Sequence, residues 1–212
     1  GVQTCALPIF AVSKGVRDDI SKLSKIDKNK IKVIYNPAAL GINWPSAELI
    51  NGFKENLWKG NQGLKILAVG TLKEQKGFDV LINSIDMLEE NFKQKVQLTI
   101  LGEGPERKNL ADQIHRLNLE KFIFMPGFQI DPYPWFFSAD LFVLSSRWEG
   151  FGNVIVEALE AGLPVVSTNC LSGPSEILQD GKFGELVSIE DPKSLSDAIA
   201  KSLAVEHDKQ DL

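Results

Sequence analysis

Two glutamates and two glycines around one predicted helix start form the group of residues best suited to chemistry. Glu149 precedes Gly150 and Gly152, and Glu157 follows Glu149 by eight positions. If a helix begins at Asn153, Glu157 lies one turn inside it and Glu149 lies on the preceding loop. Both carboxylates can then face one ligand, while the glycines let that ligand approach the backbone closely.

The same helix start offers a site for an anion. The backbone N–H groups of Asn153 and Val154 lack acceptors inside the helix, and the helix dipole favours negative charge there. Carboxylates would repel a phosphate, so Glu149 and Glu157 are better suited to accept hydrogen bonds from hydroxyl groups. A ligand with central phosphates and hydroxyls at both ends is a sugar nucleotide. The alternative, a helix-starting Glu149 and a solvated Glu157, is less favoured beside two glycines, a strand before and a helix after.

Other segments at the ends of predicted strands could contribute to this site, because ligands of open α/β sheets bind beyond the carboxyl ends of strands. Gly70 ends one such strand, and the Lys76 ammonium could neutralise a diphosphate, although alone this segment favours a solvated loop lysine. GEGP at 102–105 lacks the third glycine of the dinucleotide motif. The aromatic run 135–137 is predicted to lie in the core, and Glu176 in the first turn of a short helix.

Short apolar runs alternate with helical patterns over most of the chain. The runs predicted as strands are 31–37, 65–70, 96–102, 122–127, 140–146, 164–169 and 185–189. Helices are predicted over 78–90, 105–118, 153–162 and 192–203, and within 13–26. Because the strand runs are continuously apolar, we expect a parallel sheet covered on both faces. The predicted fold is an α/β, Rossmann-like doubly wound parallel sheet, with a variable loop or weak helix at 43–63.

The composition excludes several classes of protein. The 212 residues carry a formal net charge of −5, so a nucleic-acid partner is not expected. No apolar run approaches the roughly 20 residues of a membrane-spanning helix. Cys170 is the only cysteine outside the first ten residues, which suits a reducing cytoplasm. GxSxG, P-loop and paired-aspartate motifs are absent and neither histidine has a second ligand nearby, so no metal ion or other cofactor is expected.

The motifs occur in the order found in one enzyme family. Residues from about 11 to 204 resemble the C-terminal half of a retaining family 4 glycosyltransferase of the GT-B architecture. The resembling segments are AVSKGVRDDI, KVIYNP, VGTLKEQKGFDVLI, LTILGEGPER, FMPGF, SADLFVLSSRWEGFGNVIVEALEAGLPVVST and GPSEILQDGKFGELV. The resemblance implies two Rossmann-like domains in the intact enzyme, of which the C-terminal one holds most of a nucleotide-sugar donor.

The resemblance assigns a role to each motif residue. It implies that Glu149, the candidate catalytic residue, contacts the hydroxyls of the donor sugar and that Glu157 contacts the ribose. Lys76 matches the lysine that contacts the diphosphate, and the FMPGF loop places Phe128 and Gln129 near the base. The donor-binding residues implied in full are Gly70, Thr71, Lys76, Phe128, Gln129, Gly150, Phe151, Gly152, Asn153, Val154 and Glu157.

Thr71 departs from the family pattern. Family members commonly carry an arginine at this position, so one cation rather than two would face the leaving diphosphate. Lys73 or Arg147 could supply the missing charge.

The reaction implied by the resemblance is transfer of a sugar, with retained configuration, from a UDP- or GDP-linked donor to a hydroxyl acceptor. The leaving phosphate would take the acceptor proton, and the protein would orient the reactants and stabilise charge. The expected acceptor is a glycan or lipid-linked sugar of bacterial surface polysaccharide synthesis, contacted through the N-terminal domain. The expected location is the cytoplasm, with the intact parent at the inner face of the membrane.

The two ends of the chain suggest part of a larger protein. Back-translation of residues 1–9 resembles a sequencing-library adapter, so we expect this segment to be foreign and disordered. We expect residues 10–36 to be the tail of a preceding domain and 37–212 to be a nucleotide-sugar-binding domain, truncated at its C-terminus. The chain alone is then expected to turn over little. A non-catalytic nucleotide-sugar-binding module and a GT-B sugar-nucleotide epimerase stay open as alternatives.

Overall fold

A six-stranded parallel sheet forms the centre of the computed structural model, which describes residues 8–38, 41, 43–58 and 63–205. In spatial order the strands are β5 (Ile123–Gly127), β4 (Val96–Leu101), β3 (Leu64–Val69), β6 (Leu141–Leu144), β7 (Val165–Thr168) and β8 (Glu185–Val187). All neighbouring pairs run parallel. All six residues of β4 are buried, as expected for a sheet covered on both faces. The predicted fold class is confirmed.

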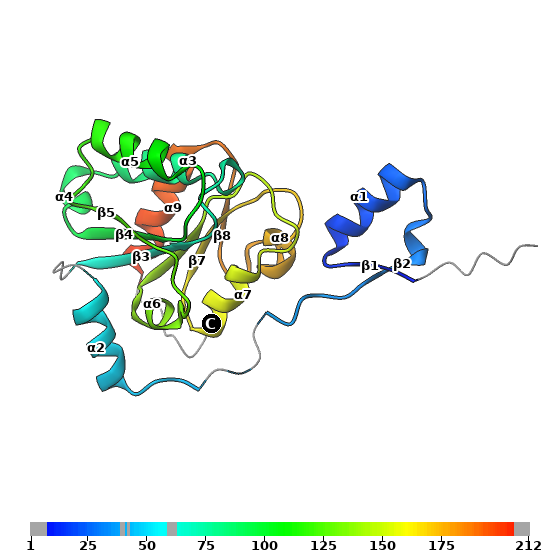
Figure 1. Ribbon diagram of the computed structural model, residues 1–212, viewed down its shortest axis with the longest axis horizontal. Coiled ribbons are helices and arrows are strands. Elements are labelled where there is room, and N and C mark those ends of the chain that lie inside the picture. The colour runs from blue at the N-terminus through cyan, green and yellow to red at the C-terminus, as the bar shows by residue number, and fades with distance from the viewer. Residues whose placement is uncertain (1–7, 39–40, 42, 59–62, 206–212) are drawn as a thin grey trace, which may run out of the picture.

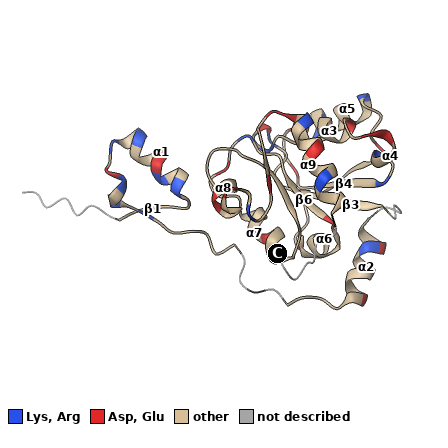
Figure 2. Ribbon diagram, turned by 180° about the vertical axis from the view of Figure 1, so that it is seen from behind, with Lys and Arg blue, Asp and Glu red and all other residues tan. Residues whose placement is uncertain are grey.

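Helices cover both faces of this sheet (Figure 1). One face packs against α3 (Phe78–Asp86), α5 (Arg107–Arg116) and α9 (Pro192–Ala204). The other packs against α2 (Ala47–Leu57), α6 (Tyr133–Ser138) and α7 (Asn153–Glu160). The short helices α4 (Glu90–Lys93) and α8 (Pro174–Ile177) lie at the edges of these layers. Acidic and basic residues are interspersed along the outer helices α3, α4 and α5 (Figure 2).

The prediction for residues 43–63 is only partly right. Residues 47–57 form α2, which begins at Ser46, whose hydroxyl accepts a hydrogen bond from the backbone N–H of Leu49. Trp58 is 1% exposed, and its indole N–H donates to the hydroxyl of Ser138 over 2.8 Å. The apolar ring is therefore in the core with its polar atom paired, which makes α2 a fixed part of the layer. The aromatic run at 135–137 is buried in the same cluster, as predicted.

A small unit precedes the main sheet. It consists of β1 (Ile9–Ala11), α1 (Lys14–Ser24) and β2 (Ile31–Val33), with the two strands parallel and Ile9 opposite Ile31. It lies at one end of the molecule (Figure 1). Ile9 therefore belongs to a strand, contrary to the expected disorder of residues 1–9. Residues 1–7 of that segment lie outside the described residues.

The strand order contains a topological switch point between β3 and β6. From β3 the chain proceeds outward through β4 to β5, then returns to the other side of β3 and proceeds from β6 through β7 to β8. The loops after β3 and β6 consequently leave the sheet in opposite directions. Ligands of open α/β sheets bind in the crevice that forms at such a point.

Candidate functional site

Lys76 and Glu149 meet across the switch point. The Lys76 ammonium lies 2.6 Å from Glu149 Oε1, and the Ser146 hydroxyl donates to the same oxygen over 2.7 Å. Lys76 is on the loop after β3 and Glu149 is on the loop after β6. The two side chains are only 16% and 9% exposed, so solvent screens their attraction weakly. Two residues predicted separately therefore form one preassembled charged pair.

Hydrogen bonds to backbone carbonyl groups join the two loops that carry this pair. The Ser145 hydroxyl donates to the carbonyl of Lys76 over 2.8 Å, and the Arg147 N–H donates to the carbonyl of Gln75 over 2.8 Å. The Gln75 amide donates to the carbonyl of Trp148 over 2.9 Å. Gly77, with φ at +58°, completes the close approach, because a Cβ there would lie 2.2 Å from the carbonyl oxygen of Ser145.

Helix α7 begins at Asn153, as predicted, and has no side-chain cap at Gly152. Its first N–H groups therefore stay available to an anion. Val154 packs its side chain against the core, so it offers the site its backbone only. Glu157 is half-buried on the next turn, and burial, followed by the negative charge of Glu160, raises the pKa of its carboxyl group.

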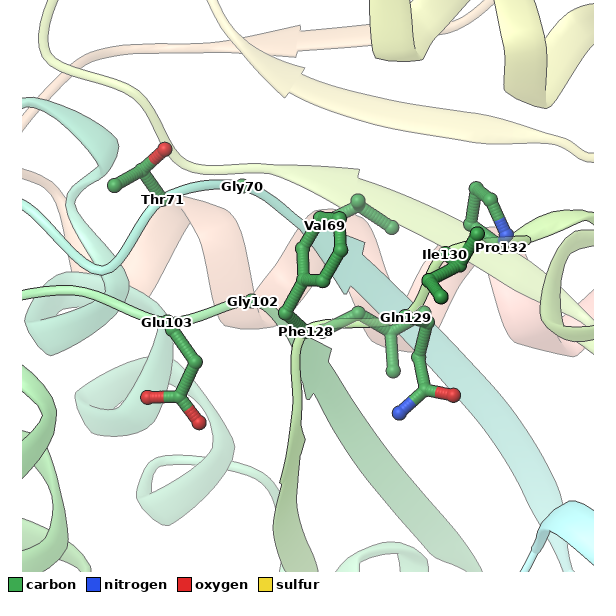
Figure 3. Close-up of a pocket in the computed structure, with 10 residues that line it drawn as sticks. Val69, Gly70, Thr71, Gly102, Glu103, Phe128, Gln129, Ile130 and Pro132 are labelled. Carbon is green, nitrogen blue, oxygen red and sulfur yellow. The ribbon is translucent and has the colours of Figure 1, made fainter.

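A cavity of about 390 Å³ opens beside this loop pair (Figure 3). Its lining residues are Val69, Gly70, Thr71, Leu101, Gly102, Glu103, Phe128, Gln129, Ile130 and Pro132. They come from the carboxyl ends of β3, β4 and β5. Phe128 and Ile130 are 70% and 94% exposed, so their apolar surfaces are open to a ligand. The Phe128 ring points towards the side where Val69 and Gly70 lie, whereas the amide of Gln129 points away (Figure 3). An exposed ring beside apolar walls suits a flat, partly apolar group.

Gly70 links the cavity to the charged pair. A Cβ at Gly70 would lie 3.1 Å from Cε of Lys76, so the lysine stem passes directly over this strand end. Thr71, the next residue, is exposed at the cavity wall. The geometry brings together Gly70, Thr71, Lys76 and Glu149 as one continuous surface.

Arg147 does not supply the cation that Thr71 lacks. Its guanidinium donates to both carboxylate oxygens of Asp79, over 2.9 and 2.8 Å, and also pairs with Glu190. These hydrogen bonds, the one to Asp79 foremost, raise the pKa of Arg147 further above its already high ordinary value. The side chain is committed to these partners. Lys73 is exposed, and its role stays a prediction.

The small N-terminal unit contacts the loop before α7, which the sequence did not indicate. The Ser13 hydroxyl donates to the carbonyl of Gly150 over 2.8 Å, and the Tyr35 ring lies 5.5 Å from that of Phe151. The side-chain amide of Asn36 donates to that of Asn153 over 3.1 Å.

Glu176 is the second contact point of this unit. Its carboxylate accepts the backbone N–H of Lys14 and, over 2.6 Å, the hydroxyl of Tyr35. The position of Glu176 in the first turn of a short helix does not indicate that it binds residues so far away in the sequence. No signal in the sequence could have identified this partner.

Metal-binding clusters and membrane-spanning helices were sought throughout the described residues. Among the described residues, no group of three or more His, Cys, Asp or Glu side chains is placed to hold a metal ion. In the same residues, no helix has the length and hydrophobicity that crossing a bilayer requires.

Comparison with known proteins identifies the family. Residues 53–212 match the family described as "Glycosyl transferases group 1". An N-acetylgalactosaminyltransferase of Campylobacter jejuni that acts on a diphospho-undecaprenol-linked sugar is 32% identical over 188 residues, which are 88% of this chain and 48% of that protein. An uncharacterized glycosyltransferase of Methanocaldococcus jannaschii is 36% identical, over 71% of this chain and 37% of that protein. The chain thus spans less than half the length of these two relatives.

Solved structures agree with this assignment. HepE from Anabaena, crystallised with UDP, superimposes with a TM-score of 0.81 at 25% identity, over 93% of this chain and 54% of that one. HepE has also been crystallised with UDP-glucose. The structural neighbours are GT-B glycosyltransferases, whose fold matches the parallel sheet and flanking helices described above. The chain belongs to the group 1 family of glycosyltransferases.

Proposed function

We propose that the chain binds a nucleotide-diphosphate sugar and supplies the donor side of a retaining sugar transfer to a hydroxyl acceptor. The observation that carries this proposal is the Lys76–Glu149 pair, held 2.6 Å apart at the switch point of the sheet. It lies between an apolar cavity and the start of α7. This arrangement offers a flat apolar surface, a positive charge and carboxylates in the order that base, diphosphate and sugar require.

In this proposal each part of the donor meets a different part of the site. The base enters the cavity beside Phe128, and the ribose hydroxyls donate to Glu157. The diphosphate lies between the Lys76 ammonium and the N–H groups of Asn153 and Val154. The sugar hydroxyls donate to Glu149. The positive charge comes from Lys76 and the helix start, so the proposal needs no metal ion.

The proposed chemistry forms a bond between the acceptor oxygen and the anomeric carbon and breaks the bond between that carbon and the diphosphate oxygen. The departing phosphate oxygen takes the acceptor proton, so atoms and charge balance without a protein base. Lys76 and the helix start stabilise the negative charge that develops on the diphosphate. Relatives named for polysaccharide and lipopolysaccharide synthesis suggest a bacterial glycan or lipid-linked sugar as acceptor. Low turnover by the chain alone remains an expectation.

Binding of nucleotides to the chain tests this proposal. UDP, UDP-glucose, GDP and ADP would be titrated into the 212-residue chain by calorimetry. Because a neighbouring structure holds UDP, we expect UDP and UDP-glucose to bind and Lys76→Met to weaken both. Lys193→Met is the matched control, since the Lys193 side chain is 67% exposed and pairs with Asp197 on the same helix, α9. Absence of binding by every nucleotide contradicts the proposal.

A non-catalytic nucleotide-sugar-binding module is the second candidate. The observation that favours it is the low positive charge near the strand ends: Thr71 carries no charge, Arg147 is bound to Asp79 and Glu190, and Lys76 is paired with Glu149. Weaker charge stabilisation would reduce catalysis more than binding. Release of UDP from UDP-glucose in the presence of an acceptor would exclude the module, because the module binds without releasing UDP. Low turnover by the chain alone is expected of both candidates and does not separate them. The described site gives no comparable support to the epimerase alternative.

A further inference from the structure

Arg147 is the centre of a hydrogen-bond network behind the Lys76–Glu149 pair. Its guanidinium makes a two-pronged contact with Asp79, in the first turn of α3, and pairs with Glu190, which precedes α9. Nη1 also donates to the carbonyl of Glu74 over 2.6 Å. One side chain therefore ties together the segments that follow β3, β6 and β8.

These contacts hold the Lys76 loop from two sides. The backbone N–H of Arg147 donates to Gln75 and its side chain donates to Glu74, the two residues that precede Lys76. Ser146, directly before Arg147, donates its hydroxyl to Glu149. A shift of the Arg147 side chain would thus remove one of the hydrogen bonds that hold the segment before Lys76 against the loop of Glu149, beside those of Ser145 and Gln75.

Arg147 itself lies outside the surface expected to meet the donor. It lines a separate cavity of about 190 Å³ together with Phe78, Asp79 and Glu106. That cavity shares no lining residue with the one beside Phe128. An effect of Arg147 on ligand binding must therefore act through other residues.

The ion pairs of Arg147 are better suited to fixing the position of side chains than to stabilising the whole fold. Asp79 and Glu190 are about half exposed, so pairs of this kind contribute modestly to global stability. Burial acts against ionisation of Asp79, but the Arg147 hydrogen bonds and charge hold the pKa of its carboxyl group below the ordinary value. The guanidinium fork fixes direction as well as charge, which a lysine could not do.

We propose that Arg147 is a positioning residue that holds the Lys76 ammonium where the diphosphate of the donor binds. This inference rests on the proposed function, because it assumes that Lys76 meets the diphosphate. Thr71 supports the inference: with no arginine at that position, the placement of the Lys76 ammonium matters more for binding of the diphosphate.

A double-mutant cycle with UDP as the probe tests the inference. UDP affinity would be measured for the unaltered chain, Arg147→Met, Lys76→Met and the double variant. We expect Arg147→Met to weaken UDP binding about tenfold, the scale of one charge-assisted hydrogen bond to phosphate. In the Lys76→Met background the same change should have almost no effect. Arg147→Lys should recover little, since lysine lacks the fork.

The outcomes separate this inference from the proposed function. Equal losses from Arg147→Met in both backgrounds, or no loss, overturn the positioning role while leaving the donor site intact. Absence of UDP, GDP and ADP binding by the unaltered chain overturns both. If Arg147→Met fails to fold, Asp79→Asn replaces it in the same cycle, because it removes the carboxylate that accepts both hydrogen bonds of the guanidinium. The same two outcomes then support or overturn the positioning role. Lys193→Met serves as the control and should leave UDP affinity unchanged.

Discussion

Nζ of Lys76 lies 2.6 Å from Oε1 of Glu149, although the two residues are 73 positions apart in the chain. The contact spans the two loops that leave the sheet in opposite directions at its switch point. The positive charge of Lys76 and the negative charge of Glu149 balance each other, so neither charge is left without a partner at a place where both side chains are largely shielded from solvent. A ligand with both a phosphate and a hydroxyl group can replace each half of this contact separately.

Replacing Glu149 should therefore change the affinity for the nucleotide and for the nucleotide sugar by different factors. Glu149→Gln removes the charge that neutralises Lys76, so UDP affinity should rise about two- to fivefold. The same change weakens the contact with the sugar, so the affinity of UDP-glucose relative to UDP should fall. Calorimetric titration with both ligands measures the ratio. Equal changes for both ligands would show that Glu149 does not meet the sugar.

Glu157→Gln should increase stability at neutral pH. Burial, and then the charge of Glu160, raises the pKa of this carboxyl group in the folded chain. The folded state then binds more protons than the unfolded state, so the free energy of unfolding falls as pH rises between the two pKa values. The cost of burying the ionised carboxylate therefore persists above the folded-state pKa and is absent below the unfolded-state pKa. The variant should thus gain most at about pH 8 and nothing near pH 4, by urea denaturation.

Glu55→Gln provides the control for this pH dependence. Glu55 is exposed on α2, so its replacement removes the same charge without the burial that underlies the effect expected at Glu157. Glu157→Gln should also weaken UDP binding, because a neutral amide is a poorer acceptor for ribose hydroxyls. A gain in stability as large for Glu55→Gln as for Glu157→Gln, or a UDP affinity that Glu157→Gln leaves unchanged, would contradict the role assigned to Glu157.

Glu176→Ala should loosen the small N-terminal unit. The carboxylate accepts hydrogen bonds from the Lys14 N–H and the Tyr35 hydroxyl, and loss of a charged acceptor of this kind costs ~1–3 kcal/mol. Hydrogen exchange in α1 and β2 should become faster while exchange in β4 stays slow. Asp197→Ala, in an exposed pair on α9, is the control. Unchanged exchange in α1 would show that the other contacts of the unit suffice.

The elements of the main sheet could be predicted because each is encoded locally. Continuous apolar runs gave the strands, and the glycines before Asn153 marked the start of α7 to the residue. The run that begins at Ile31 was predicted to be stopped by Asn36 and Pro37, whereas β2 already ends at Val33. Ile9 pairs with Ile31 in a strand where disorder was expected, since pairing depends on a partner far along the chain.

The side-chain arrangement of the site depends on contacts between distant segments and was less predictable. Lys76 and Glu149 were identified individually, but their direct contact depends on the order of strands in space. Arg147 was considered as a cation for the diphosphate, and nothing near it in sequence indicated that Asp79 and Glu190 would bind it. Residue type gives the chemistry of a group, and the tertiary fold decides whether that group is free.

Gly102→Ala should be among the most damaging single changes in the chain. Gly102 directly follows β4 and has φ at +140°, and a Cβ there would lie 2.0 Å from the carbonyl oxygen of Gly70. Both glycines line the cavity beside Phe128 (Figure 3), so relief of this collision must move the strand ends that form the site. We expect a loss of ~3 kcal/mol or more in the free energy of unfolding and weaker UDP binding.

Comparison with Gly181→Ala separates the steric part of this effect from backbone strain. Gly181 has φ at +99°, but a Cβ there would meet no atom within 4 Å. The variant should lose only the ~1–2 kcal/mol of backbone strain and retain UDP affinity. Urea denaturation and UDP titration of both variants measure the difference. Equal losses in the free energy of unfolding would mean that backbone strain alone makes Gly102 necessary. A larger loss for Gly102→Ala, together with weaker UDP binding, would show that the close packing of β3 against β4 supports the nucleotide site.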